Sequence, residues 1–108
     1  GDSVIGNNCS FGAGAICANL RLDEKEIGDS KMNKLGVVMG DNVRVGVNTS
    51  LMPGIKIGSN TMISSGLIVA QDIEPNKYVS GKTELTIQDN RAELDPNARP
   101  AMMKSLKN

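Results

Sequence analysis

The sequence predicts an all-β fold, a parallel β-helix in which a short strand and a corner repeat every six residues. The first observation is that an aliphatic residue opens each six-residue block of residues 39–70, at Met39, Val45, Leu51, Ile57, Ile63 and Val69. The second is that a small residue follows in most blocks, and that asparagine or glycine stands at most corners. A six-residue period is typical of a solenoid with three faces and coils of about 18 residues.

The main alternative is a loop-rich β-sandwich with evenly spaced strands. Strands of a sandwich usually recur at about 8 to 12 residues, so a spacing of six argues against it. Aromatic residues are only 2% of the chain, Phe11 and Tyr78. That would be meagre for an ordinary globular core, but it is expected where a thin column of aliphatic side chains fills the interior.

Residues 1–18 already carry the repeat, with Ile5, Phe11 and Cys17 spaced by six, which makes one complete coil. Cys9 and Cys17 both fall on apolar positions, which favours buried, inert thiols over a disulfide or a nucleophile. An uncovered first coil would leave strand edges and apolar positions open. We therefore expect this sequence to be cut from, or descended from, something longer.

Charged residues replace the repeat between Asn19 and Gly36. We interpret the 22 positions from Cys17 to Met39 as one coil plus four extra residues, so that loop 19–36 protrudes from one corner while the helix continues beneath it. Long polar loops on a rigid solenoid usually carry binding function. A merely solvated loop remains the alternative.

The repeat fades after Ala70. A last strand is predicted at residues 84–88, so we assign residues 1–88 to the β-helix domain and residues 89–108 to a C-terminal tail. Two prolines interrupt this tail, and residues 100–106 either form a short helix or stay irregular.

Charge and histidine content exclude several functions. Basic and acidic residues number 12 each, so no global field draws the chain to nucleic acid or to anionic lipid. No apolar run approaches the roughly 18 residues of a membrane span, and we expect a cytoplasmic protein. The chain has no histidine, which excludes a His-ligated zinc site and a Ser-His or Cys-His pair. No metal ligand and no catalytic residue is assigned.

Apolar residues also fall on positions of the repeat that face outward, at Val38, Val47, Met52, Met62 and Ile68. A lone prism would leave these side chains in water. Exposed apolar patches on a small domain usually mark an interface. We therefore predict a homotrimer.

Three stretches resemble a known family. They are Gly-Ala-Gly-Ala-Ile-Cys-Ala-Asn at 12–19, Gly-Val-Val-Met-Gly-Asp-Asn-Val at 36–43 and Pro-Gly-Ile-Lys-Ile-Gly at 53–58. They resemble the acetyltransferase half of the bifunctional sugar-1-phosphate nucleotidylyltransferase/acetyltransferases. The resemblance implies a left-handed β-helix, assembled as a trimer, with acetyl-CoA bound between neighbouring subunits. It also implies N-acetyl transfer to an amino-sugar 1-phosphate.

The same resemblance implies a set of coenzyme-binding residues. Ala13 and Asn19 match residues that line the acetyl end of the coenzyme. Val47 and Ser65 match positions whose backbone groups meet the pantetheine arm, and Lys82 matches a basic residue near the coenzyme phosphates. Each residue also has an ordinary structural interpretation, as a corner residue, a turn former or a solvated charge.

Two further residues are implied to contact the sugar substrate. Lys34 matches a lysine that meets the sugar phosphate, and Ser10 stands where bacterial members carry a substrate-contacting asparagine. By its spacing, the family's catalytic histidine would fall before Gly1 and has no counterpart here, so we expect a partial domain without that base. The alternative function is a non-catalytic trimeric β-helix that binds a coenzyme or a protein.

Overall fold

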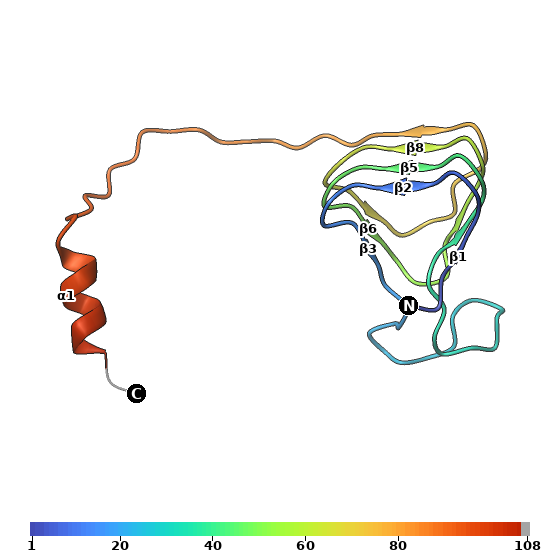
Figure 1. The fold of residues 1–108 in the computed structure, drawn as a ribbon, viewed down its shortest axis with the longest axis horizontal. Coiled ribbons are helices and arrows are strands. Elements are labelled where there is room, and N and C mark those ends of the chain that lie inside the picture. Colours follow the sequence, from blue (N-terminus) through green and yellow to red (C-terminus); the bar gives the residue numbers. More distant parts are fainter. Residues whose placement is uncertain (107–108) are drawn as a thin grey trace.

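A computed structural model describes residues 1–106, which form a triangular prism followed by a detached tail (Figure 1). The strands are β1 (Val4–Ile5), β2 (Ser10–Phe11), β3 (Ile16–Cys17), β4 (Val38–Met39), β5 (Arg44–Val45), β6 (Ser50–Leu51), β7 (Lys56–Ile57), β8 (Met62–Ile63), β9 (Ile68–Val69) and β10 (Tyr78–Val79). The helix α1 spans Ala98–Ser105.

The strands stack into three parallel sheets, one on each side of the prism. Face A holds β1, β4 and β7, face B holds β2, β5, β8 and β10, and face C holds β3, β6 and β9. Each strand pairs with a strand one coil away, and every pair is parallel. The predicted parallel β-helix is therefore confirmed, and the arrangement fits the left-handed form.

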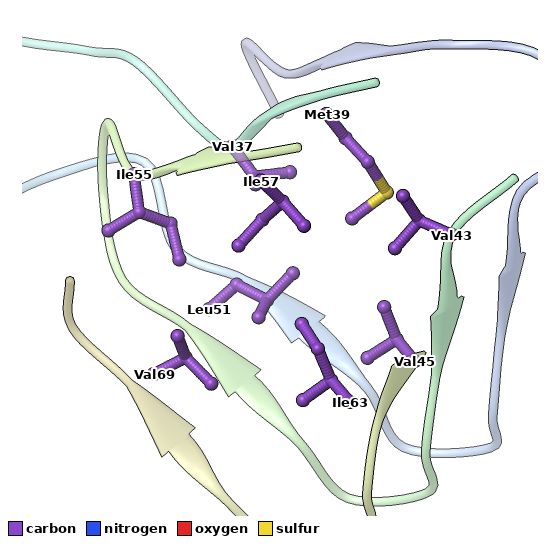
Figure 2. Close-up of a cluster of buried hydrophobic side chains, with 9 residues drawn as sticks. All are labelled: Val37, Met39, Val43, Val45, Leu51, Ile55, Ile57, Ile63 and Val69. Carbon is purple, nitrogen blue, oxygen red and sulfur yellow. The ribbon is translucent and has the colours of Figure 1, made fainter. Parts of the chain in front are cut away.

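The interior is a narrow aliphatic column, as predicted (Figure 2). The six residues that open the repeat blocks are each no more than 5% exposed. Val37, Val43 and Ile55 complete this core from the positions just before the strands. Thr49 and Thr61 are also fully buried, and each hydroxyl donates a hydrogen bond to a backbone carbonyl, so neither polar group is left without a partner.

The corner between faces A and B is built from stacked asparagines. Asn8, Asn42, Asn60 and Asn76 all adopt positive φ, which asparagine tolerates better than most residues. The Asn8 side-chain amide donates to the Asn42 carbonyl oxygen at 2.9 Å, and Asn42 donates in the same way to Asn60 at 3.2 Å. The side chains of Asn8, Asn42 and Asn60 thus form a hydrogen-bonded ladder along the prism.

The interpretation of the 22 positions between Cys17 and Met39 as one coil plus four residues is wrong. Ile5 aligns with Met39, 34 positions later, whereas Met39 aligns with Ile57 after only 18. The loop is thus a single corner enlarged by 16 residues (34 against 18), and no extra coil lies beneath it. Figure 1 shows this loop at the corner between faces C and A.

The loop has an apolar anchor. Ile27 is only 5% exposed and lies against Gly54 on the next coil. A Cβ on Gly54 would lie 2.2 Å from the Ile27 Cγ2 atom, and Gly54 itself has a φ of +74°. Glycine is therefore required there both for backbone conformation and for space.

Beyond β10 the chain leaves the prism. No strand forms at 84–88, so that prediction is wrong, and the domain boundary at residue 88 stays a prediction. The last coil is also shorter, since Ile63 aligns with Val79 after 16 positions. The predicted short helix of the tail is present, beginning at Ala98, and residues 107–108 of that tail lie outside the described range. Within residues 1–106, no helix is long and apolar enough to cross a membrane.

Both cysteines are free and pack against the core, but they are half-buried rather than buried. They belong to the first coil, which the described chain covers from one side only. The Cys9 thiol donates to the Gly40 carbonyl at 3.2 Å. Across the described residues, no group of three or more His, Cys, Asp or Glu side chains is placed to hold a metal ion.

Candidate functional site

Three of the predicted coenzyme-binding residues lie in one column at the corner between faces B and C. Ala13, Val47 and Ser65 occupy the same position on successive coils. The Asn48 amide donates to the Ala13 carbonyl at 2.9 Å, and the Gly66 amide donates to the Val47 carbonyl at 2.9 Å. The Val47 amide donates to the Ser65 hydroxyl at 3.1 Å. We call these three residues the corner column.

The backbone of this corner is held by small residues. Gly14, Asn48 and Gly66 take positive φ values of 76°, 53° and 73°, which turns the chain on each coil. A Cβ on Gly12 would lie 2.5 Å from the Val47 nitrogen, and one on Gly46 would lie 2.5 Å from the Ser65 nitrogen. Glycine therefore allows successive coils to stack directly at the column.

The corner column offers backbone groups to solvent. Ala13 and Ser65 are exposed, and Val47 is 45% exposed. Within residues 1–106, the amides of Ala13 and Ser65 find no hydrogen-bond acceptor. Two exposed N–H donors along a ridge can bind carbonyl oxygens of an extended ligand.

Lys82 stands beside the end of this column, next to Gly81, which occupies the column position on the last coil. Val79 aligns with Ile63, so Lys82 occupies the corner position that Gly66 occupies one coil below. Gly81 lies beside Leu67, since a Cβ on Gly81 would be 2.7 Å from a Leu67 methyl carbon. The corner column therefore ends in an exposed positive charge, which is suited to a phosphate.

Asn19 and Lys34 lie together elsewhere, at the base of the loop. Leu20 and Lys34 form an antiparallel bridge, and the Leu35 amide donates to the Asn19 carbonyl at 2.9 Å. The Asn19 side chain donates to the Asp2 carboxylate at 2.7 Å. Strand β3 separates this pair from Ala13, so a single chain does not bring the seven predicted residues into one site.

Ser10 lies on face B, apart from both groups. It is exposed on β2 and is aligned with Arg44 on β5. The Arg44 guanidinium donates to the Asn8 backbone carbonyl and, at 3.4 Å, to the Asn8 side chain. Sequence reasoning missed Arg44 as the neighbour of Ser10, because the pairing depends on the register across the enlarged corner.

An apolar pocket of about 510 Å³ lies under the loop and was also missed. It is lined by Ala18, Leu20, Arg21, Leu22, Asp23, Met52 and Pro53. The alternating Leu20 and Leu22 within a charged segment are the sequence signal that could have indicated it. Four of its lining residues, Leu20 to Asp23, directly follow Asn19 along the chain.

Electrostatics at this pocket hold one carboxylate in its charged form. The Asp23 carboxylate accepts a hydrogen bond from the Lys25 amide at 3.1 Å and from the Arg21 guanidinium at 2.6 Å. These bonds, the backbone one first, lower the pKa of Asp23 below its ordinary value. The lowered pKa makes the Asp23 carboxylate a weak base, poorly suited to take a proton from a substrate.

Comparison with known proteins identifies the six-residue repeat of this chain and several proteins of similar sequence. The family model for the bacterial transferase hexapeptide (six repeats) matches residues 36–71. The bifunctional protein GlmU of Methanococcus maripaludis is 45% identical over 98 residues, which are 84% of this chain and 24% of that protein. The bifunctional sugar-1-phosphate nucleotidylyltransferase/acetyltransferase of Sulfurisphaera tokodaii is 43% identical over 81 residues, covering 68% of this chain and 20% of that protein.

A solved structure shares the fold. Serine acetyltransferase isoform 3 of Entamoeba histolytica, in complex with cysteine, superposes with a TM-score of 0.65 at 23% identity. The match covers 97% of this chain and 33% of that chain. The chain thus spans about a quarter of the length of the curated relatives it matches.

Proposed function

We propose that this chain binds acetyl-CoA and serves acyl transfer. The chain is a hexapeptide-repeat domain homologous to part of the bifunctional sugar-1-phosphate nucleotidylyltransferase/acetyltransferases. The observation that carries the proposal is the corner column ending in Lys82. An extended coenzyme lies along it, with carbonyl oxygens on the Ala13 and Ser65 amides and phosphates at Lys82.

The acceptor is an amino-sugar 1-phosphate, and the site is shared between subunits of a homotrimer. Asn19 and Lys34 lie across β3 from the corner column, so a neighbouring subunit supplies them to each site. Outward apolar side chains support this assembly, since Val47, Met62 and Ile68 are 45%, 52% and 76% exposed. Of the remaining predicted interface residues, Val38 and Met52 are half-buried.

In the reaction, the sugar amine attacks the thioester carbonyl, and the thiolate of coenzyme A leaves. The amine must lose a proton, and a positioned base contributes about 10²- to 10⁴-fold. These 108 residues contain no histidine, and hydrogen bonds lower the pKa of Asp23, which makes its carboxylate a weak base. The 108-residue polypeptide is therefore expected to bind the coenzyme but to turn over slowly. A non-catalytic scaffold is the less favoured alternative, because the named relatives are enzymes.

Two serines provide a matched test of the coenzyme site. The Ser65 hydroxyl accepts the Val47 amide at 3.1 Å, and the Ser59 hydroxyl accepts the Asp41 amide at 2.9 Å at the asparagine corner. Ser65→Glu and Ser59→Glu lose equivalent hydrogen bonds and add the same charge. Calorimetric titration should show acetyl-CoA binding weakened about tenfold or more only for Ser65→Glu, by repulsion of the anionic coenzyme. Equal weakening in both variants would contradict the proposed location.

A further inference from the structure

The three faces end differently at the last coil, which is the C-terminal end of the prism. On face A, the Lys56 amide donates to the Asp72 carboxylate at 2.8 Å, and the Gly58 amide donates to the Ile73 carbonyl at 2.8 Å. Face B gains an extra strand, β10. Face C ends at β9, with no strand above it in the described chain.

The open edge of β9 carries two unpaired backbone donors. On the coils below, the Ile16 amide donates to the Thr49 carbonyl at 2.9 Å, and the Ser50 amide donates to the Leu67 carbonyl at 2.8 Å. The amides of Ile68 and Ala70 come next in this series and find no acceptor among residues 1–106. Such an edge is a template for an added strand.

The chain does not turn the corner that would bring it over β9. Lower coils turn there through Gly14, Asn48 and Gly66, all with positive φ, but Lys82 at the same position has none. The tail therefore runs straight on from face B past the corner (Figure 1). It passes the place where a neighbouring subunit would pack.

The first part of the tail has the pattern of a strand without a partner. Residues 84–88 alternate polar and apolar, and Leu85 and Ile87 are 77% and 89% exposed. Among the described residues beyond Gly81, every hydrogen bond is local to the tail. The helix α1 has only eight residues and no side-chain cap, and a helix of that length is marginal without packing.

We infer that residues 83–88 form a strand on the open edge of β9 in a neighbouring copy of this chain. Continuing the 16-residue spacing of the last coil would place Glu84 beside Ile68 and Leu85 beside Val69. Leu85 would then cover the open end of the aliphatic column, and the Ile68 and Ala70 amides would gain acceptors. The inference rests on the proposed trimer and names the segment that ties its subunits together.

Three-fold symmetry brings the tail to that edge in the correct direction. Neighbouring faces of a triangular prism differ in direction by a third of a full turn, which is also the rotation between subunits of a closed trimer. With the three-fold axis of the proposed trimer running along the prism, a tail leaving in line with β10 is therefore parallel to β9 of one neighbour. Since a closed ring has no rise along its axis, the tail also arrives one level above β9, where the missing strand belongs.

Disulfide trapping tests the pairing directly. Neighbouring parallel strands lie about 4.8 Å apart, within the range that a disulfide bridges. Chains carrying Ile68→Cys and chains carrying Glu84→Cys are coexpressed and mildly oxidised, with the wild type and each variant alone as controls. We expect a linked pair of chains on a non-reducing denaturing gel, only from the mixture.

Each other outcome would overturn the inference. A chain carrying both substitutions that forms its disulfide internally would show that the tail closes its own coil. A trimer by sedimentation that gives no linked chains would reject the exchange alone. A monomer that still binds acetyl-CoA would reject the exchange and the trimer, and would leave the coenzyme proposal standing.

A pair of leucine variants gives an independent measurement. Leu85 and Leu94 are similarly exposed in the isolated chain, at 77% and 85%. Leu85→Asp should raise the concentration at which the trimer dissociates by about tenfold or more, because the inference buries this side chain. Leu94→Asp should leave it unchanged, and equal effects would contradict the inference.

Discussion

The corner between faces B and C and the corner between faces C and A start from the same six-residue repeat and end differently. At the first, Ala13, Val47 and Ser65 stay in step on successive coils and form a ridge of backbone groups. At the second, 16 additional residues extend the first coil into a loop anchored by Ile27. The comparison teaches that the regular repeat builds the ridge proposed to bind the coenzyme. The departure from the repeat carries Asn19 and Lys34, proposed to lie at the acetyl end of the coenzyme and at the sugar phosphate.

The largest expected difference between the two regions is in stability. Leu51 is fully buried in the aliphatic column, whereas Leu22 in the loop is fully exposed. Leu51→Ala should lower the free energy of unfolding by about 2–5 kcal/mol, because it leaves a cavity in a narrow core. Leu22→Ala should change it by less than about 0.5 kcal/mol. Urea denaturation at one fixed chain concentration measures both, and similar losses would refute the assignment of the core.

A smaller effect is expected at the upper end of the corner column. Lys82 and Lys77 are exposed lysines on either side of β10, and only Lys82 lies beside the end of the corner column, next to Gly81, which occupies the column position. Lys82→Ala should weaken acetyl-CoA binding by about 1 kcal/mol or somewhat more, the scale of a hydrogen bond to a charged group. Lys77→Ala serves as the control in the same titration. An unchanged affinity in Lys82→Ala would remove this residue from the site.

The smallest effect belongs to the loop. Because the pKa of Asp23 is lowered in the folded chain, its contribution to stability is present above its unfolded-state pKa and is lost as pH falls through the lower, folded value. The contribution is slight, since Asp23 and Arg21 are both exposed. An NMR titration should show the Asp23 pKa rising in Arg21→Ala without reaching its ordinary value, because the Lys25 amide remains. No change in that variant would contradict the assigned cause.

The interior could be predicted from the sequence because each coil repeats the same local requirement, an aliphatic residue at Val45 or Ile57 and an asparagine at Asn42 or Asn60. The enlarged corner could not, since spacing alone does not say whether 22 positions contain a coil or only a corner. That depends on which strands pair, and the pairing of Ile5 with Met39 decides it.

The tail is a second case in which the local sequence pattern does not show whether a strand has a partner. Leu85 and Ile87 alternate with polar residues, and this pattern alone predicts a strand at 84–88. That prediction is wrong, because Lys82 does not turn the corner and the segment has no neighbouring strand among the described residues. Likewise, the resemblance predicts which residues bind the coenzyme, but only the register of the coils shows that three of these predicted residues lie in one column.

Hydrogen exchange with and without acetyl-CoA tests the central claim most directly. The claim is that the corner column, and not the asparagine corner, binds the coenzyme. We predict that acetyl-CoA slows exchange of the Ala13 and Ser65 amides, while the amides of Asp41 and Ser59 exchange at unchanged rates. Protection confined to the asparagine corner, or no protection at either corner at a saturating concentration of acetyl-CoA, would contradict the account.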